Sequence, residues 1–489
     1  MASTCCSATA IDTTQIVILG SGGAAMAAAI TAAERGAQVH VVERGTIGGT
    51  CVNVGCIPSK HLVRCGQLEH WCELHKHQTV SNAVNGCPCP GMLDAPKLRT
   101  ARQALVEQLR YQKYERVLGE NPRITTWHGE ARFHDPQSVW VRTTADDGSR
   151  VDTLLRFDRC LIAVGAAPCI PPIDGLAEVP FWTSTEALAS DQIPRRLAVI
   201  GSSAVALELA QAYARLGSRV WILARHGLCT RTDPLVGDTL GAALVSDGRI
   251  EIRCHTRVER VRYRDGLFTM TLDSQETSVE VDALLVACGR RPNTAALQLD
   301  AAGVHWDAAS GTVPVNDRMQ TNVPNIYAAG DCTNMPQLVY VAAAAGTRAA
   351  IQMTGGDAKL DLSLVPWVIF TDPQVAAVGL TEAEAHALGL QTQVRTLPVT
   401  NVPRSIVHGE KYGFLKVVAD ITSKRILGAQ AVASEASDMI ATVAVAMRGG
   451  LTVPDLAELL IPYLTASEAV KLVAQSFTRD VQKLSCCAG

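Results

Sequence analysis

The sequence predicts an α/β protein with two Rossmann-like domains and a C-terminal α+β domain. Two strand–glycine-loop–helix units, which open at residues 16 and 197, predict the Rossmann-like domains. After residue 365, strands and helices follow one another without a third glycine-rich loop, as in a separate mixed domain. A chain of 489 residues is long enough for several hydrophobic cores, so this division agrees with its length.

Composition and charge narrow the class of protein. A formal net charge of −3 gives no electrostatic reason to expect binding to nucleic acid or to an anionic membrane. The longest apolar runs, such as residues 16–19 and 197–200, have the length of strands and are too short to span a membrane. Residues 1–12 lack the pattern of a signal peptide and are expected to be flexible. Sixteen cysteines spread over this length indicate a cytoplasmic protein with thiol chemistry.

The first Rossmann-like unit predicts a dinucleotide site. A buried strand at residues 16–19 is followed by a glycine-rich turn and an alanine-rich helix to about residue 36. A second strand, residues 38–42, ends in Glu43, which is placed to accept hydrogen bonds from a ribose diol. The turn allows a pyrophosphate to approach the N-terminus of the helix. The residues expected to contact the dinucleotide here are Gly20, Gly22, Gly23, Ala24 and Glu43.

A glycine-rich segment with two cysteines follows directly. Cys51 and Cys56 are five residues apart, a spacing that does not bring two side chains together on one face of a helix. If the two sulfurs bond, the segment must be a loop that leads into a helix, which we expect to start near residues 56–58. Cys56 would then lie at the positive end of the helix dipole, where the pKa of a thiol falls. A structural disulfide or half of a zinc site is the alternative, but no second pair follows at zinc-finger spacing, so a redox-active pair is favoured.

Other cysteines and tyrosines give weaker signals. Cys5 and Cys6 could bind a soft metal, and Cys87 and Cys89 could also bind metal. A chance pair in the flexible terminus is favoured for the first two, and a solvated loop over residues 76–93 for the others. Around this loop, helices are expected at residues 59–75 and 96–118, the second of which carries Tyr111 and Tyr114. Strands of a meander are expected at residues 124–158, and a strand and turn with Gly165 at residues 161–168.

The second Rossmann-like unit predicts a different nucleotide. Its strand at residues 197–200 is followed by Gly201 and Ser203 at the first two glycine positions, then by a helix at residues 204–216 and a strand at residues 219–223. Where an acid would select NADH, the chain has Arg225 and then Arg231. Two arginines suit the 2′-phosphate of NADPH, and two solvated arginines without a ligand are the alternative.

The C-terminal third combines one further site with an expected interface. A strand at residues 325–330 ends in Gly330 and Asp331, an acid at the carboxyl edge of a sheet where ligand hydroxyls can be bound. The region after residue 365 is expected to be an oligomerisation domain, and the chain ends with Cys486 and Cys487. Its expected strands lie at residues 366–379 and 413–432, and its expected helices at residues 381–388, 435–449, 454–459 and 466–474.

Together, the two nucleotide-binding units, the Cys51/Cys56 segment and the C-terminal domain resemble the pyridine nucleotide–disulfide oxidoreductases over residues 14–489. The resemblance implies an FAD-binding domain, an NADPH-binding domain and a dimerisation domain in a homodimer. The implied boundaries are a flexible terminus at 1–12, FAD-binding segments at 13–168 and 291–364, an NADPH-binding domain at 169–290 and a dimerisation domain at 365–489.

One departure from that family points to a particular branch. Its disulfide reductases carry a catalytic histidine where this chain has Tyr463, although Glu468 keeps the acidic position that follows. A tyrosine, with a pKa near 10, is a poor proton donor for a leaving thiolate. With Tyr114 and the terminal Cys486–Cys487 pair, Tyr463 makes the chain resemble the mercuric reductases of the family, whose soft Hg(II) substrate takes thiolate ligands.

This resemblance implies a reaction and a set of roles. NADPH, with Arg225 and Arg231 on its 2′-phosphate, reduces FAD, and the flavin opens a Cys51–Cys56 disulfide. Hg(II) from thiol complexes is captured by Cys486 and Cys487 of one subunit and passed to Cys51 and Cys56 of the other, where Tyr114 and the partner's Tyr463 position it. Lys60 and Glu208 match an ion pair beside the reactive edge of the flavin. The remaining implied cofactor contacts are Gly49, Thr50, Lys60, Gly165, Gly201, Ser203, Gly330 and, on the flavin ribityl chain, Asp331.

Two other functions compete with this interpretation. A disulfide reductase such as dihydrolipoamide dehydrogenase predicts a catalytic histidine, which the sequence lacks at Tyr463. A non-enzymatic protein that sequesters mercury through Cys486 and Cys487 leaves the two nucleotide loops and the Cys51/Cys56 pair unexplained. Reduction of Hg(II) to Hg(0) is therefore the expected activity.

Overall fold

The computed structural model describes residues 13–78, 94–145, 147–273 and 278–480. The chain divides into two compact units. The first comprises residues 1–58, 103–168 and 290–361, and the second comprises residues 59–102, 169–289 and 362–489. Within the described residues, no helix combines the length and apolar character needed to cross a membrane.

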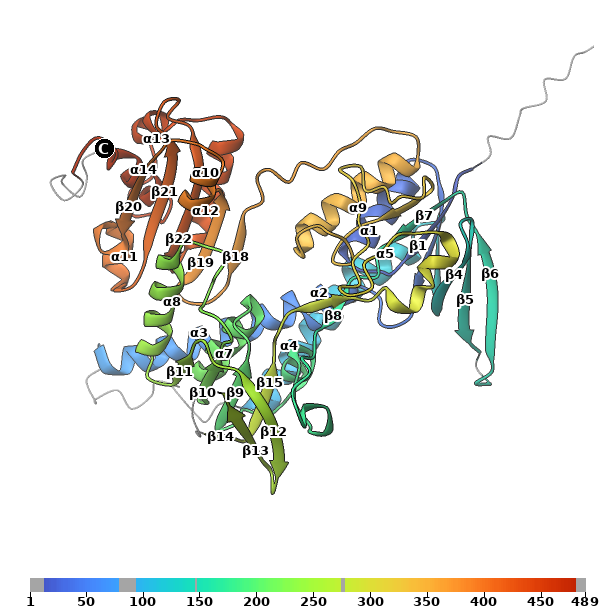
Figure 1. Cartoon of the computed structure of the whole chain (residues 1–489), viewed down its shortest axis with the longest axis horizontal. Helices are drawn as coiled ribbons and strands as arrows, with labels where there is room; N and C mark the ends of the chain where they lie inside the picture. The colour runs from blue at the N-terminus through green and yellow to red at the C-terminus, as the bar shows by residue number, and fades with distance from the viewer. Residues whose placement is uncertain (1–12, 79–93, 146, 274–277, 481–489) are drawn as a thin grey trace, which may run out of the picture. The chain divides into compact units, whose positions relative to one another are not determined.

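A five-stranded parallel sheet organises the first unit, in the order β17-β7-β1-β2-β3. The residues of β1, β7 and β17 are nearly all buried because helices cover these strands, whereas β2 is only partly buried and most residues of β3 are not. Helices α1 (Gly23–Glu34) and α9 (Val339–Met353) pack against each other beside this sheet (Figure 1). The strands are β1 (Gln15–Leu19), β2 (Gln38–Glu43), β3 (Ile124–His128), β7 (Arg159–Ile162) and β17 (Ile326–Ala328).

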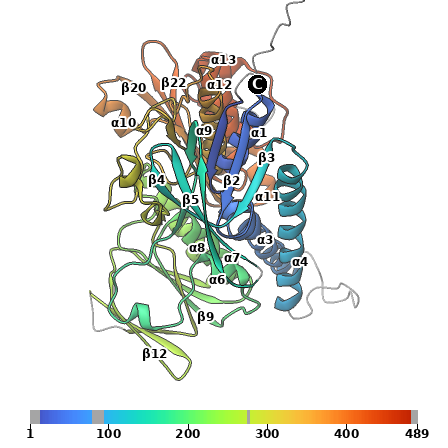
Figure 2. The same ribbon diagram turned by 90° about the vertical axis from the view of Figure 1, so that its right-hand side faces the viewer.

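One expectation for the first unit was wrong. Residues 124–158 do not form a single meander, because β3 joins the parallel sheet next to β2 (Figure 2). Only the three strands that follow form an antiparallel sheet of their own, and a short antiparallel pair links two distant segments. These strands are β4 (Glu130–Asp135), β5 (Ser138–Thr144) and β6 (Arg150–Arg156), and the pair is β8 (Ala166–Pro168) with β16 (Arg290–Pro292). Two 3₁₀ turns, η3 (Ala295–Leu297) and η4 (Leu299–Ala302), follow β16.

The helices around the cysteines differ from the expected loop and helix. Cys51 lies in a short helix, α2 (Gly49–Val54), and a break at Gly55 precedes α3 (Cys56–Gln78). The predicted start of the second helix near Cys56 is confirmed. The helix expected at residues 96–118 is three elements, namely α4 (Ala95–Arg110), a π-helical turn η1 (Tyr111–Glu115) and α5 (Arg116–Gly119).

The second unit contains the other Rossmann-like sheet, with strand order β11-β10-β9-β15. The predicted strand, helix and strand are confirmed as β9 (Arg196–Ile200), α7 (Ala204–Arg215) and β10 (Arg219–Leu223). The apolar residues of these elements form one buried cluster with those of α8 (Pro234–Ser246). The other elements here are η2 (Leu176–Glu178), α6 (Ser184–Ala189), β11 (Ile250–Arg253), β12 (Val258–Arg264), β13 (Leu267–Leu272), β14 (Ser278–Val281) and β15 (Ala283–Val286).

A five-stranded antiparallel sheet forms the C-terminal part of the second unit, in the order β18-β19-β22-β21-β20. The stretches expected as strands each contain two, namely β18 (Trp367–Ile369) with β19 (Gln374–Gly379), and β21 (Phe414–Asp420) with β22 (Ile426–Ala433). Helices α12 (Ala436–Arg448) and α14 (Glu468–Gln475) pack on the sheet. The expected helices α10 (Glu382–Ala387) and α13 (Val453–Glu458) are present, whereas β20 (Thr392–Pro398), η5 (Val399–Asn401) and α11 (Pro403–His408) were not predicted.

Candidate redox and nucleotide-binding site

The first glycine-rich turn forms a backbone cradle. Gly22 is the N-cap of α1, and Gly23 and Ala24 begin its first turn, so their N–H groups point out of the helix end. Gly49 approaches this turn so closely that a Cβ on it would lie 2.6 Å from the Cα of Gly22. Gly49 also has a φ of +65°, which favours glycine. A pyrophosphate fits such a cradle because only backbone lines it and the helix dipole attracts its charge.

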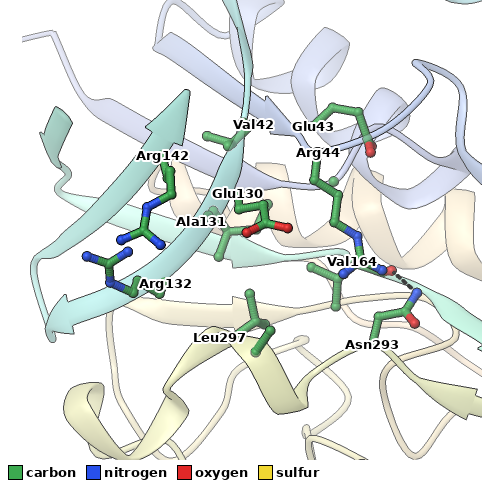
Figure 3. Close-up of a pocket in the computed structure, with 14 residues that line it drawn as sticks. Val42, Glu43, Arg44, Glu130, Ala131, Arg132, Arg142, Val164, Asn293 and Leu297 are labelled. Atoms are coloured by element: carbon green, nitrogen blue, oxygen red, sulfur yellow. Dashed lines mark hydrogen bonds between the residues drawn. The ribbon is translucent and has the colours of Figure 1, made fainter. Parts of the chain in front are cut away.

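A cavity of about 240 Å³ lies at the carboxyl ends of β1 and β2 (Figure 3). Glu43 lines it, and its two carboxylate oxygens accept hydrogen bonds from Ser21 Oγ at 2.7 Å and from Gly45 N–H at 2.7 Å. The cavity is also lined by Arg44, whose side chain lies beside Val164 and Asn293 (Figure 3). Asn293 Nδ2 donates to the carbonyl of Val164 at 3.0 Å. The position of the cavity beside the cradle and its mixture of apolar and charged walls suit the nucleoside end of a dinucleotide.

A half-buried acid and a half-buried arginine lie near the same sheet edge. Gly165 and Gly330 follow β7 and β17, two neighbouring parallel strands whose carboxyl ends meet at one edge. Next to Gly330, burial raises the pKa of Asp331, and the nearby Arg290 opposes that rise. Arg290 Nε lies 3.8 Å from Asp331 Oδ2, and its Nη2 donates to Thr50 Oγ1 at 3.4 Å. The sequence contains no signal for Arg290, because no local pattern shows that an arginine will lie half-buried beside an acid from a distant segment.

Cys51 and Cys56, the predicted redox pair, lie at a helix junction. Cys51 lies in α2, Cys56 is the first residue of the 23-residue helix α3, and both are half-buried. The predicted position of Cys56 at the positive end of a helix dipole is therefore confirmed. Burial, and then the charge that both cysteines carry as thiolates, raises the pKa of Tyr114. Tyr114 therefore lies close enough to sense the charge of the two cysteines, and a Cβ on the nearby Gly48 would lie 3.4 Å from its Cγ.

The second unit holds the predicted ion pair. Lys60 Nζ lies 2.6 Å from Glu208 Oε2, and the Glu208 side chain is only 4% exposed. The Lys60 ammonium also lies 4.8 Å from the centre of the Phe370 ring, a cation–π contact that sequence reasoning did not predict. The carboxylate, the ammonium and the aromatic ring therefore restrain one another.

The second nucleotide loop is built around Ser203 rather than a glycine. Ser203 caps α7, accepting the N–H of Ala206 at 3.2 Å and donating to the carbonyl of Ala287 at 2.9 Å. A glycine at this position has no side chain and could make neither of these hydrogen bonds, so Ser203 stabilises the loop in a way that glycine cannot. Arg225 and Arg231 are exposed after β10, where a bound nucleotide could reach them, and Arg225 Nε donates to His226 Nε2 at 3.2 Å.

Of the remaining predicted residues, Tyr463 and Glu468 lie within the described part of the chain. Tyr463 is 48% exposed, and Glu468, whose pKa burial raises, accepts the N–H of Leu464 at 3.1 Å. Cys486, Cys487, Cys5, Cys6, Cys87 and Cys89 lie outside the described residues. Within the described ranges, no group of three or more His, Cys, Asp or Glu side chains could hold a metal ion.

Comparison with known proteins identifies the family. Residues 14–346 match the pyridine nucleotide-disulphide oxidoreductase model, and residues 365–474 match its dimerisation domain. The mercuric reductase of Acidithiobacillus ferrooxidans is 52% identical over 97% of this chain and 84% of its own length. That of Shigella flexneri is 52% identical over 97% and 82%, and that of Streptomyces lividans is 41% identical over 97% and 98%.

Solved structures show the same architecture. The HOCl-induced flavoprotein disulfide reductase RclA of Escherichia coli aligns with a TM-score of 0.83 and 29% identity, over 95% of this chain and all of that one. LpdA of Mycobacterium tuberculosis aligns with a TM-score of 0.82 and 26% identity, over 95% and 100%. These likenesses confirm the predicted fold class. A flavin and a pyridine nucleotide suit this fold. The chain belongs to the pyridine nucleotide-disulphide oxidoreductase family.

Proposed function

We propose that this protein is an NADPH-dependent mercuric reductase that converts Hg(II) to volatile Hg(0). The observation that carries the proposal is the position of the Tyr114 ring over Gly48, beside the segment with Cys51 and Cys56, in a chain that has Tyr463 in place of the histidine of disulfide reductases. The similarity to mercuric reductases over nearly the whole chain supports the same conclusion.

The residues present suit FAD and NADPH. The Gly22–Gly49 cradle would hold a pyrophosphate, Glu43 a ribose, and Asp331 the hydroxyls of a ribityl chain. When bound, the flavin relays the reducing equivalents of NADPH to the neighbouring cysteines. Gly201 and Ser203 would receive the NADPH pyrophosphate, and Arg225 and Arg231 its 2′-phosphate.

The chain's own thiols would handle the metal. Hg(II) in a complex with two thiols exchanges its ligands for the protein thiols, releasing the two small thiols as it moves inward. The partner subunit's Cys486 and Cys487 would receive it first, and Cys51 and Cys56 would hold it during reduction. The overall reaction is NADPH plus Hg(II) to NADP⁺, H⁺ and Hg(0), so two electrons balance and no protonated leaving thiol is needed. A tyrosine can therefore replace the histidine at residue 463.

The protein's assembly and location belong to the same proposal. The match to a dimerisation domain indicates a homodimer, and delivery by the partner's tail would make each site a product of both subunits. The abundance of cysteine thiols, which persist in reducing compartments, supports a cytoplasmic location.

Anaerobic oxidation of NADPH by the flavin-loaded protein tests the proposal. Hg(II), oxidised glutathione and lipoamide are supplied in separate parallel assays. The assay with Hg(II) also contains excess free thiol. We expect NADPH consumption with Hg(II) alone, accompanied by loss of volatile metal. Turnover of a disulfide without any response to Hg(II) would overturn the proposal in favour of a disulfide reductase, and metal binding without NADPH consumption would favour a sequestering protein.

A further inference from the structure

Tyr114, whose ring lies over Gly48 beside the segment that carries Cys51, is presented by an unusual turn. Tyr114 lies in the π-helical turn η1, between the regular helices α4 and α5. Such a turn contains one residue more than an α-helical turn, costs some helix stability and occurs mostly at functional sites. One extra residue rotates the side chains that follow by about 100° relative to a continuous α-helix. The direction of Tyr114 therefore depends on whether this turn keeps its π geometry.

An ion pair spans the turn. Arg110 Nε lies 3.0 Å from Glu115 Oε1, and the two residues are five positions apart. In an α-helix the side chains that face each other are three or four positions apart, so a pair at five positions is favoured by a wider turn. The Arg110–Glu115 contact consequently stabilises the π geometry relative to the α geometry.

The same arginine is joined to the segment that carries Cys51. Arg110 Nη1 donates to Asn53 Oδ1 at 3.3 Å, and the amide of Asn53 donates in turn to the carbonyls of Ile47 and Gly49 at 2.9 Å each. The side-chain nitrogen of Asn53 therefore binds the backbone at Ile47 and Gly49, and its side-chain oxygen binds Arg110. These contacts tie the π-turn to the backbone on both sides of Gly48.

Gly48 leaves room for the tyrosine ring. Its φ of +102° favours glycine, and a Cβ at this position would lie 3.4 Å from Tyr114 Cγ and 2.6 Å from Val52 Cγ1. The ring therefore lies directly over a residue that has no side chain. A small change in the direction of Tyr114 would remove the ring from this place and from the cysteines.

We propose that Arg110, Glu115 and Asn53 are positioning residues that hold the π-turn so that Tyr114 faces Cys51 and Cys56 while Hg(II) is transferred. The inference rests on the proposed mercuric reductase function and adds the residues that orient one of its groups. None of the three needs to touch the metal, because each acts through Tyr114 or through the backbone around Gly48.

The substitution Arg110→Met tests the inference, because it removes both contacts and keeps an unbranched apolar stem. We expect kcat for Hg(II) to fall on the order of ten- to hundred-fold, as displaced active-site groups commonly do, with little change in KM for NADPH. Electron transfer from NADPH to an artificial acceptor such as a quinone should stay within about two-fold, because Cys51, Cys56 and the nucleotide sites are unchanged. Lys113→Met is the matched control, since Lys113 is an exposed cation of the same turn and makes no ion pair within the described residues.

A double-mutant cycle asks whether Arg110 acts through Tyr114. If it does, Arg110→Met combined with Tyr114→Phe should be no slower with Hg(II) than Tyr114→Phe alone. Glu115→Gln should give a smaller loss of the same kind, because the Asn53 contact remains. Additive losses, or an equal fall in quinone reduction, would overturn the inference.

A readout without mercury separates this inference from the proposed function. The Tyr114 phenol is titrated in the alkaline range by difference spectroscopy between the flavin-loaded protein and its Tyr114→Phe variant. Loss of the Arg110 cation by itself would raise the phenol pKa further, whereas a ring that turns into solvent would return toward the ordinary value near 10. We expect the pKa of Tyr114 to fall in Arg110→Met and to be unchanged in Lys113→Met. An unchanged or higher pKa in Arg110→Met would contradict the positioning role. Because this titration contains no mercury, its result does not depend on whether the protein reduces Hg(II).

Discussion

Lys60 and Glu208 are 148 residues apart in the sequence, yet Lys60 Nζ lies 2.6 Å from Glu208 Oε2. The other oxygen of the carboxylate accepts the backbone N–H of Phe370 at 2.9 Å. The Glu208 side chain is buried, whereas the Lys60 side chain is 37% exposed. Glu208 therefore relies on Lys60 to balance its charge more than Lys60 relies on Glu208. The carboxylate has lost most of its water, whereas the ammonium has kept part of its own.

This difference in burial predicts that removing the Lys60 cation lowers the free energy of unfolding more than removing the Glu208 anion does. Lys60→Met leaves a buried carboxylate with one hydrogen bond and should lower the free energy of unfolding by about 2–3 kcal/mol. Glu208→Gln keeps the acceptor for Phe370 and leaves a lysine that solvent can screen, so it should cost about 1 kcal/mol or less. Urea denaturation of the flavin-loaded protein compares the two variants, and a larger loss for Glu208→Gln would contradict the argument.

Flavin binding should depend on the absence of a side chain at residue 49. In Gly49→Ala the new methyl group would lie 2.6 Å from the Cα of Gly22, so the two backbones must separate and the phosphate cradle opens. We expect purified protein with little or no flavin absorbance. Gly148→Ala is the control, because it has a similar φ of +79° but nothing within 4 Å of the added Cβ. Its cost should be limited to about 1–2 kcal/mol of backbone strain with normal flavin content; flavin loss in both variants would show that strain, and not the close approach, is responsible.

The choice of nicotinamide nucleotide should depend on the exposed arginines after β10. Replacing Arg225 and Arg231 by alanine removes two cations that suit a 2′-phosphate but contribute nothing to a ribose without that group. We expect KM for NADPH to rise by about ten- to hundred-fold while KM for NADH changes little. Steady-state kinetics with both nucleotides measures this directly, and a parallel rise for both would mean that the arginines do not contact the phosphate.

Flavin retention should become sensitive to acid when Arg290 is lost. Burial raises the pKa of Asp331 and the Arg290 charge opposes the rise, so Arg290→Met should raise that pKa further. The raised value means that Asp331 takes up its proton at a higher pH as the solution is acidified. If ionised Asp331 holds the flavin, the variant should release FAD at a higher pH than the unaltered protein, which flavin fluorescence in the filtrate detects. Identical release curves would show that the charge of Asp331 does not hold the cofactor.

The C-terminal cysteines should matter for capture of mercury and not for electron transfer. Removing residues 486–489 takes away two tethered thiols whose effective concentration near the redox pair would exceed that of free thiols. Turnover of thiol-complexed Hg(II) should fall by about ten-fold or more, while quinone reduction by NADPH stays unchanged. Ser485→Ala serves as the control for changes at the chain end. Full mercury turnover without the tail would show that the metal reaches Cys51 and Cys56 by another route.

The sequence by itself determined the parts of this protein that depend on neighbouring residues. The strand, glycine turn and helix of each nucleotide-binding unit lie where expected, as do Cys56 at the start of α3 and Ser203 at the start of α7. These features follow from local chemistry, because a glycine turn, a helix cap and a run of β-branched residues act within a few positions of the chain.

Packing decided the features that local chemistry does not encode. Strand β20 was missed because most of its residues are only half-buried, so neither alternation nor a continuous apolar run marks it. The partial burial of Arg290, its approach to Asp331 and the direction of Tyr114 were likewise invisible in the sequence. Each depends on groups brought together from distant segments, where desolvation and long-range hydrogen bonds outweigh the preferences of the local chain. The sequence therefore determined which chemical groups the site contains, and the tertiary structure decided which of them face one another.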